Sequence, residues 1–124
     1  MVLPLTFYGN PVLRKKGAEV ESVTPELEDF IDNMFETMAE HRGIGLAAQQ
    51  VGRTIQLTVI DIRAAENRPS TLEIDGETAD PHSLMPLVLI NPEVTPLNDP
   101  VSGPEGCLSF PEIYGDVTRP EQVR

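Results

Sequence analysis

Cysteine is nearly absent from this sequence, since Cys107 is the only one among 124 residues. A single thiol cannot form a disulfide within the chain. Free thiols are typical of compartments in which cysteine is kept reduced, so we expect a cytoplasmic protein. Histidine is almost as scarce, with only His41 and His82. The two do not have the four-residue spacing of a metal-binding pair on a helix.

Basic residues and long apolar runs are also scarce. Nine lysines and arginines stand against 20 aspartates and glutamates, which gives a formal net charge of −11. Nucleic acid and anionic membranes would repel such a chain, so we expect neither as a partner. The first residues show no basic segment followed by an apolar one, which argues against a signal peptide. No apolar stretch approaches the ~20 residues that cross a bilayer.

The size of the chain fits one domain, and we take residues 1–124 as a single domain. Its clearest element is a helix that begins after Thr24, because this hydroxyl can cap it and Pro25 suits the first helical position. Apolar residues then recur at three- and four-residue steps, which predicts an amphipathic helix ending at Gly43. These residues are Leu27, Phe30, Ile31, Met34, Phe35 and Met38.

Two further segments are rich in β-branched and apolar residues and predict strands: residues 54–62, with a buried centre, and residues 87–90. The polar residues 63–86 between them predict a loop, or a loose hairpin around Asp75 and Gly76. Residues 4–17 predict a loop with a single helical turn.

Prolines weaken the strand pattern in the C-terminal third. Pro96 and Pro100 leave at most an edge strand in residues 94–103, and Pro120 interrupts a short strand predicted within residues 113–123. The predicted helix and the short predicted strands together indicate an α+β fold, in which we expect a long N-terminal helix to pack on small antiparallel sheets.

The first motif is Gly-Ile-Gly-Leu-Ala-Ala-Gln-Gln-Val-Gly at residues 43–52, between the predicted helix and the first strand, so we expect a loop. Gly43 and Gly45 allow positive φ and a close approach of another segment. Gln50 brings an amide that can donate or accept a hydrogen bond. Taken alone, the glycines are explained more simply by a helix C-cap and a tight turn.

The second motif is Glu-Gly-Cys-Leu-Ser at residues 105–109. A thiolate is a good ligand for a divalent transition metal. A lone cysteine without a nearby histidine is, however, more simply an inert thiol that packs as a small apolar residue. A nucleophilic cysteine needs an adjacent base, and Ser109 lacks the Gly-x-Ser-x-Gly frame of a nucleophile elbow.

In combination, the two motifs resemble the first two signature blocks of the peptide deformylases. These metal-dependent hydrolases remove the formyl group from the N-terminal methionine of new polypeptides. Residues 8–14 are similar to the N-terminal segment of that family, and residues 60–61 and 89–93 to its strand ends. The resemblance covers most of residues 4–124 except 63–86, which we interpret as a variable insertion.

The resemblance implies a metal ligand and three catalytic residues. Cys107 would bind one divalent metal ion as a thiolate, with Fe(II) as the usual metal and Zn or Ni as alternatives. Gln50 would hydrogen-bond the formyl oxygen or the metal-bound water. The Leu108 N–H would stabilise the oxyanion, and the backbone of Gly45 would bind the substrate.

Further residues are implied around the substrate. Gly43 and Ile44 would help to line the pocket for the methionine side chain, and Tyr114 falls where the family contacts the bound peptide. Glu105 would lie on the substrate side, and its ion pair with Arg119 would hold the cysteine segment in shape.

The family's third block is a helix carrying His-Glu-x-x-His, which supplies two more metal ligands and the glutamate that passes a proton to the departing amine. It does not occur in residues 1–124. We therefore expect an incomplete deformylase domain, truncated before the central metal-binding helix. Such a chain would bind metal weakly or not at all, and would be inactive and poorly stable alone.

Two alternatives stay open beside the incomplete enzyme. The first is a non-catalytic module that binds formyl-methionine peptides without metal, and the second is a metal-free thiol enzyme that uses Cys107. The partners implied for the complete enzyme are N-formyl-Met nascent peptides, met transiently near the ribosome exit. Its products would be formate and a free N-terminal methionine, and we expect a monomer.

Overall fold

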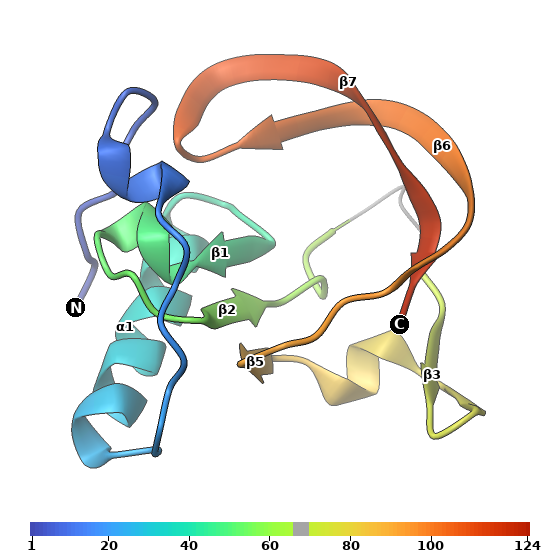
Figure 1. Ribbon diagram of the computed structural model, residues 1–124, viewed down its shortest axis with the longest axis horizontal. Helices are drawn as coiled ribbons and strands as arrows, with labels where there is room; N and C mark the ends of the chain where they lie inside the picture. Colours follow the sequence, from blue (N-terminus) through green and yellow to red (C-terminus); the bar gives the residue numbers. More distant parts are fainter. Residues whose placement is uncertain (66–69) are drawn as a thin grey trace.

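A computed structural model describes residues 1–65 and 70–124 (Figure 1). The predicted insertion at 63–86 therefore includes residues 66–69, which lie outside the described part. The helices and strands are η1 Pro11–Arg14, α1 Pro25–Glu40, β1 Gly45–Ala47, η2 Ala48–Val51, β2 Leu57–Ile60, β3 Leu72–Ile74, β4 Glu77–Ala79, η3 Pro81–Leu84, β5 Leu87–Ile90, β6 Pro96–Cys107 and β7 Phe110–Val123, where η marks a 3-10 helix. No helix in these described ranges is long and apolar enough to cross a membrane.

Helix α1 begins where the sequence predicts, because the Thr24 hydroxyl accepts a hydrogen bond from the Leu27 N–H at 3.1 Å. It has 16 residues, so it is of ordinary length rather than the long helix expected. It also ends before Gly43. Arg42 takes the left-handed conformation with φ 57°, and the Gly43 N–H donates to the Met38 carbonyl at 2.9 Å. Arginine thus occupies the position where a glycine usually ends a helix.

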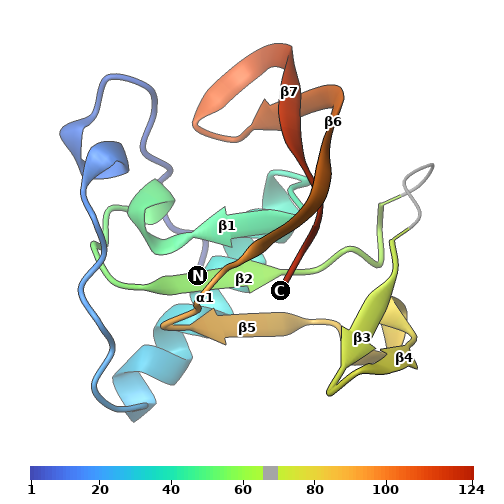
Figure 2. The ribbon, with the colours of Figure 1, turned by 45° about the vertical axis from the view of Figure 1, so that its right-hand side comes forward.

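The three-stranded sheet has the antiparallel order β1-β2-β5, and α1 packs on one of its faces (Figure 2). The strands predicted at 54–62 and 87–90 are therefore confirmed, the first in a shorter form. The core between sheet and helix is made by Leu46, Leu57 and Val59 from the sheet and by Leu27, Met34 and Met38 from α1. Both motifs contact this small core, the first through Leu46 and Ala48 and the second through Leu108.

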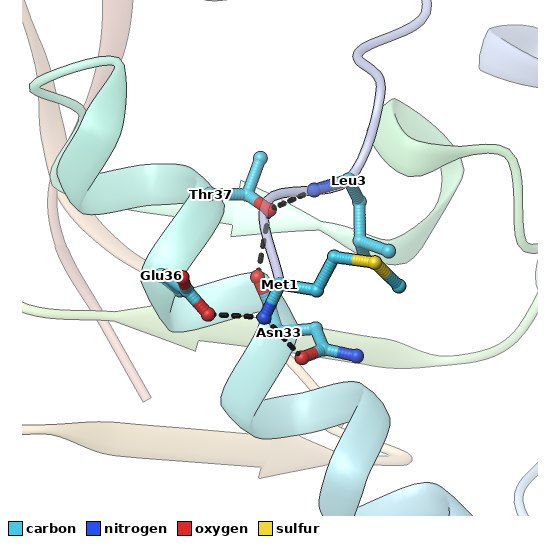
Figure 3. Close-up of polar contacts among 5 residues, drawn as sticks. All are labelled: Met1, Leu3, Asn33, Glu36 and Thr37. Carbon is cyan, nitrogen blue, oxygen red and sulfur yellow. Dashed lines mark hydrogen bonds and ion pairs between the residues drawn. The ribbon is translucent and has the colours of Figure 1, made fainter.

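The N-terminal segment crosses α1 and is held by polar contacts (Figure 3). The Leu3 N–H donates to the Thr37 hydroxyl at 2.7 Å, and that hydroxyl donates to the Asn33 carbonyl at 2.6 Å. The terminal amino group of Met1 contacts the Asn33 side-chain oxygen at 2.9 Å and pairs with the Glu36 carboxylate. Thr37 has no exposed surface, so its hydroxyl satisfies a backbone N–H where water cannot.

Strands β3 and β4 form the hairpin that residues 63–86 suggested as one option. The two residues between them, Asp75 and Gly76, have φ of 52° and 82°. Positive φ at both turn positions is what a two-residue turn of type I′ requires.

The C-terminal residues differ most from the prediction. Instead of one edge strand and one interrupted short strand, β6 and β7 form a two-stranded antiparallel ribbon of 12 and 14 residues. Figure 1 shows it arching over the sheet and returning with its turn beside the N-terminal segment. Proline is tolerated because each strand of such a ribbon has one edge that pairs with no other strand, and a residue facing that edge donates no N–H to the sheet. Pro100 and Pro120 even lie opposite each other, after a register shift near Asn98.

Candidate functional site

The motif at residues 43–52 is not the loop that we expected. Its residues Gly45–Ala47 form β1 and pair with Thr58–Ile60 of β2, and residues 48–51 form the 3-10 helix η2. Gly52 then caps η2 in the left-handed conformation, with φ 85°. The strand was missed because three paired residues depend on a distant partner strand, which leaves no periodic pattern in the sequence.

Gln50 points toward the second motif. Its side-chain oxygen accepts a hydrogen bond from the Ala47 N–H at 3.0 Å. Its side-chain nitrogen lies 3.5 Å from Cys107 Sγ and 3.4 Å from Ser109 Oγ. The two motifs are 57 residues apart between Gln50 and Cys107, and the fold brings their polar groups into direct contact.

Cys107 ends β6 with an exposed thiol, and Leu108 begins the turn into β7. The Leu108 side chain packs against the core at the point where Gly43 has no side chain. A Cβ on Gly43 would lie 2.8 Å from Leu108 Cδ1. Gly43 has no positive φ. The need for glycine at this position is therefore explained by the close approach of Leu108 rather than by the backbone conformation.

Ser109 completes the turn and is only 2% exposed. Its carbonyl accepts a hydrogen bond from the Tyr8 N–H at 2.9 Å, and the Tyr8 ring lies 4.9 Å from that of Phe110. The N-terminal segment therefore holds the turn of the ribbon in place. The sequence did not predict that Ser109 is buried, because its burial depends on this distant contact. It showed only that Ser109 lacks the sequence frame of a nucleophilic serine.

Ile44 and Gly45 lie at the free edge of the three-stranded sheet, since β1 pairs with β2 on one side only. Both residues are exposed. The Ile44 carbonyl accepts a hydrogen bond from the Asp61 N–H at 2.9 Å. The backbone at Gly45 is therefore placed where an extended peptide could pair with it.

Glu105 and Arg119 form an ion pair across the ribbon. Arg119 Nε lies 2.8 and 2.7 Å from the two Glu105 carboxylate oxygens. The pKa of Arg119 is raised, first by this hydrogen bond and then by the charge of the carboxylate. The Tyr114 ring covers Gly106 on the opposite strand, because a Cβ there would lie 2.6 Å from Tyr114 Cε1. Tyr114 itself remains 77% exposed.

The described residues do not form a complete metal centre. Among residues 1–65 and 70–124 there is no group of three or more His, Cys, Asp or Glu side chains that could hold a metal ion. His41 caps the end of α1, and His82 lies in η3, both exposed. Cys107 suits one corner of a site, whereas a catalytic zinc-type site needs three protein ligands and an open position.

Comparison with known proteins decides the family. The model of the polypeptide deformylase family matches residues 2–124. The chain belongs to the polypeptide deformylase family.

Named relatives of this deformylase chain include two bacterial peptide deformylases. That of Opitutus terrae is 45% identical and covers 99% of the chain. That of Salinibacter ruber is 44% identical and covers all of it. The chain spans 65% and 61% of these two proteins, so it matches less than two thirds of their length.

Solved deformylase structures show the same fold. The peptide deformylase of Synechococcus elongatus in complex with actinonin is 40% identical, with a TM-score of 0.79 over 98% of this chain and 56% of that one. The peptide deformylase of Thermotoga maritima is 31% identical, with a TM-score of 0.78 over 99% of this chain and 71% of that one. The α+β, deformylase-like fold expected from the sequence is thereby confirmed.

Proposed function

We propose that these residues serve in the removal of the formyl group from N-formyl-methionine peptides, to give formate and a free N-terminal methionine. The observation that carries the proposal is the contact of Gln50 Nε2 with Cys107 Sγ at 3.5 Å. It places a neutral amide donor beside the one thiol of a chain from the deformylase family.

Two donors would bind the formyl oxygen as its charge develops. The first is the Gln50 side-chain amide, whose orientation is set because its oxygen accepts from the Ala47 N–H. The second is the Leu108 N–H, at the turn that Gly43 and Ser109 hold in place. Donors fixed before the reaction stabilise an oxyanion without reorganising. The edge of β1 at Gly45 would pair with the peptide, with Ile44 and Gly43 beside the methionine side chain and Glu105 and Tyr114 nearby.

The chemistry also needs an activated water, which a divalent metal supplies when three protein ligands hold it. We propose Cys107 as one ligand, with Fe(II) as the native metal and Zn or Ni as substitutes. Because the described residues offer no further cluster of ligands, we propose that the 124-residue chain alone is inactive and binds metal weakly. Residues 1–124 would form part of a single deformylase-like domain.

A formate-release assay tests this inactivity. Purified 1–124 is incubated with N-formyl-Met-Ala-Ser and Fe(II), Ni(II) or Zn(II), and formate is measured with formate dehydrogenase. We expect no turnover above that of a Cys107→Ala control. Metal-dependent turnover at a deformylase rate, lost in the control, would refute the inactivity but support the assignment. Reading the nucleotides beyond codon 124 for His-Glu-x-x-His would show directly whether the missing block is encoded.

The second candidate is a deformylase-like module that binds peptides without catalysis. The exposed strand edge at Ile44 and Gly45 favours this module, because a peptide could bind at that edge without a metal ion. It predicts binding of formyl-methionine peptides that is unchanged by EDTA, together with no formate release. The thiol-enzyme alternative is weaker, because the side chain that contacts Cys107 is the Gln50 amide, which cannot act as a general base.

The remaining proposals concern the cellular setting. We propose a monomer that acts in the cytoplasm on nascent chains near the ribosome exit, as the substrate of the family suggests. The net charge of −11 opposes binding to nucleic acid or to anionic membranes. Size-exclusion chromatography with light scattering would test the monomer, and a dimer at micromolar concentration would contradict it.

A further inference from the structure

The Gln50 side chain can offer two N–H groups and one oxygen, and the structure gives each a direction. The oxygen accepts from the Ala47 N–H at 3.0 Å. The nitrogen lies 3.4 Å from Ser109 Oγ and 3.5 Å from Cys107 Sγ. Since an amide nitrogen carries two hydrogens, one can be donated to the serine while the other faces the cysteine.

Ser109 is well placed to be the fixed partner in this arrangement. It is 2% exposed, and its carbonyl is bound to the Tyr8 N–H at 2.9 Å. A buried hydroxyl keeps its hydrogen-bond partners because water cannot replace them. The serine therefore belongs to the rigid side of the contact, and the amide is the group that it orients.

We propose that Ser109 is a positioning residue for Gln50. Its hydroxyl accepts one amide N–H and thereby keeps the other directed to the Cys107 side, where a formyl oxygen would bind. This inference rests on the proposed role of Gln50 in formyl recognition. Without the serine oxygen, only the hydrogen bond from the Ala47 N–H would hold the amide, because the terminal torsion of glutamine has a broad intrinsic preference. A rotated amide would present its oxygen, which repels a formyl oxygen.

The contact itself is tested by NMR of the 124-residue chain labelled with nitrogen-15. In Ser109→Ala, we expect the Gln50 side-chain amide resonances to move and their exchange with water to become faster. Ser109→Thr keeps the hydroxyl oxygen and should retain the original resonances. Ser102→Ala is the matched control, since that hydroxyl lies on the same ribbon and pairs with Thr118 Oγ1 at 2.6 Å. Unchanged Gln50 resonances in a folded Ser109→Ala variant would overturn the proposal.

The functional consequence is tested by titrating N-formyl-Met-Ala and Met-Ala up to millimolar concentration. The preference for the formyl peptide should fall about three- to tenfold in Ser109→Ala, the size expected for one hydrogen bond, and stay unchanged in Ser102→Ala. If Gln50→Ala loses the preference and Ser109→Ala keeps it, the positioning role is wrong while the proposed function stands. If the preference is absent, or survives in Gln50→Ala, formyl recognition by Gln50 fails and the inference fails with it.

Discussion

Gly17→Ala tests the close packing of the N-terminal segment on the chain entering β2. A Cβ on Gly17 would lie 2.6 Å from the Ile55 carbonyl carbon, 2.7 Å from its oxygen and 2.9 Å from the Gln56 nitrogen. All three are backbone atoms, which cannot rotate away as the end of a side chain can. The two segments must therefore separate, although Gly17 has no positive φ and belongs to neither motif.

The cost of this separation follows from the hydrogen bonds that it breaks. Ala18 bridges the two segments, donating to the Thr54 carbonyl at 2.9 Å and accepting from the Gln56 N–H at 2.8 Å. Each bond contributes about 1 kcal/mol. Alanine recovers roughly 0.4–1 kcal/mol because it lowers the entropy of the unfolded chain. We expect a net loss of about 1–2 kcal/mol in the free energy of unfolding.

Urea denaturation followed by circular dichroism measures this loss. With a slope of roughly 1–3 kcal/mol per molar urea, the midpoint should fall by about 1 M. Gly115→Ala makes the same atomic change where nothing lies within 4 Å, so its midpoint should stay near that of the parent chain. Equal midpoints for the two variants would refute the argument from close approach, as would unchanged hydrogen exchange at the Ala18 and Gln56 amides.

Three further outcomes are expected from the polar contacts. Thr37→Val removes the acceptor of the part-buried Leu3 N–H and should lower stability by about 1–2 kcal/mol in urea denaturation; an unchanged midpoint would contradict this role of the hydroxyl. Hydrogen bonding to Arg63 holds the pKa of Asp61 below its ordinary value of 3.8. The resulting stabilisation is present above pH 3.8 and is lost as the pH falls through the lower folded-state pKa. Asp61→Asn should therefore flatten the acid limb of stability against pH, and an identical limb would count against the pair. Arg119→Ala removes an ion pair in which the arginine is 63% exposed. Thermal unfolding should therefore show a change in the free energy of unfolding below about 1 kcal/mol. A loss above about 2 kcal/mol would show that the pair with Glu105 stabilises the fold more than an ordinary exposed ion pair does.

The helix and the two short strands were predictable because their signals are local. The Thr24 cap and Pro25 act within one turn, so the start of α1 agrees with the prediction. Its end does not, because Arg42 takes a left-handed conformation that the sequence would assign to Gly43. That choice depends on Gly43 packing against Leu108 from the far end of the chain.

The ribbon was not predictable from proline counts. The rule that proline ends a strand holds in the middle of a sheet, where both edges of a strand are hydrogen-bonded. In a two-stranded ribbon half of the backbone groups face outward, so β6 and β7 accommodate proline with register shifts. Whether a strand has one neighbour or two is a property of the fold, and the sequence of the strand does not show it.

By itself, the sequence determined the family, the start of α1, the strands β2 and β5 and the two motifs, because each depends on residues close together in the chain. Only the tertiary structure decided which atoms of the motifs meet. The contact of Gln50 with Cys107 and Ser109, and that of Gly43 with Leu108, join segments more than 50 residues apart. Such contacts are set by the packing of the ribbon turn on β1 and the N-terminal segment, and no spacing within either motif encodes them.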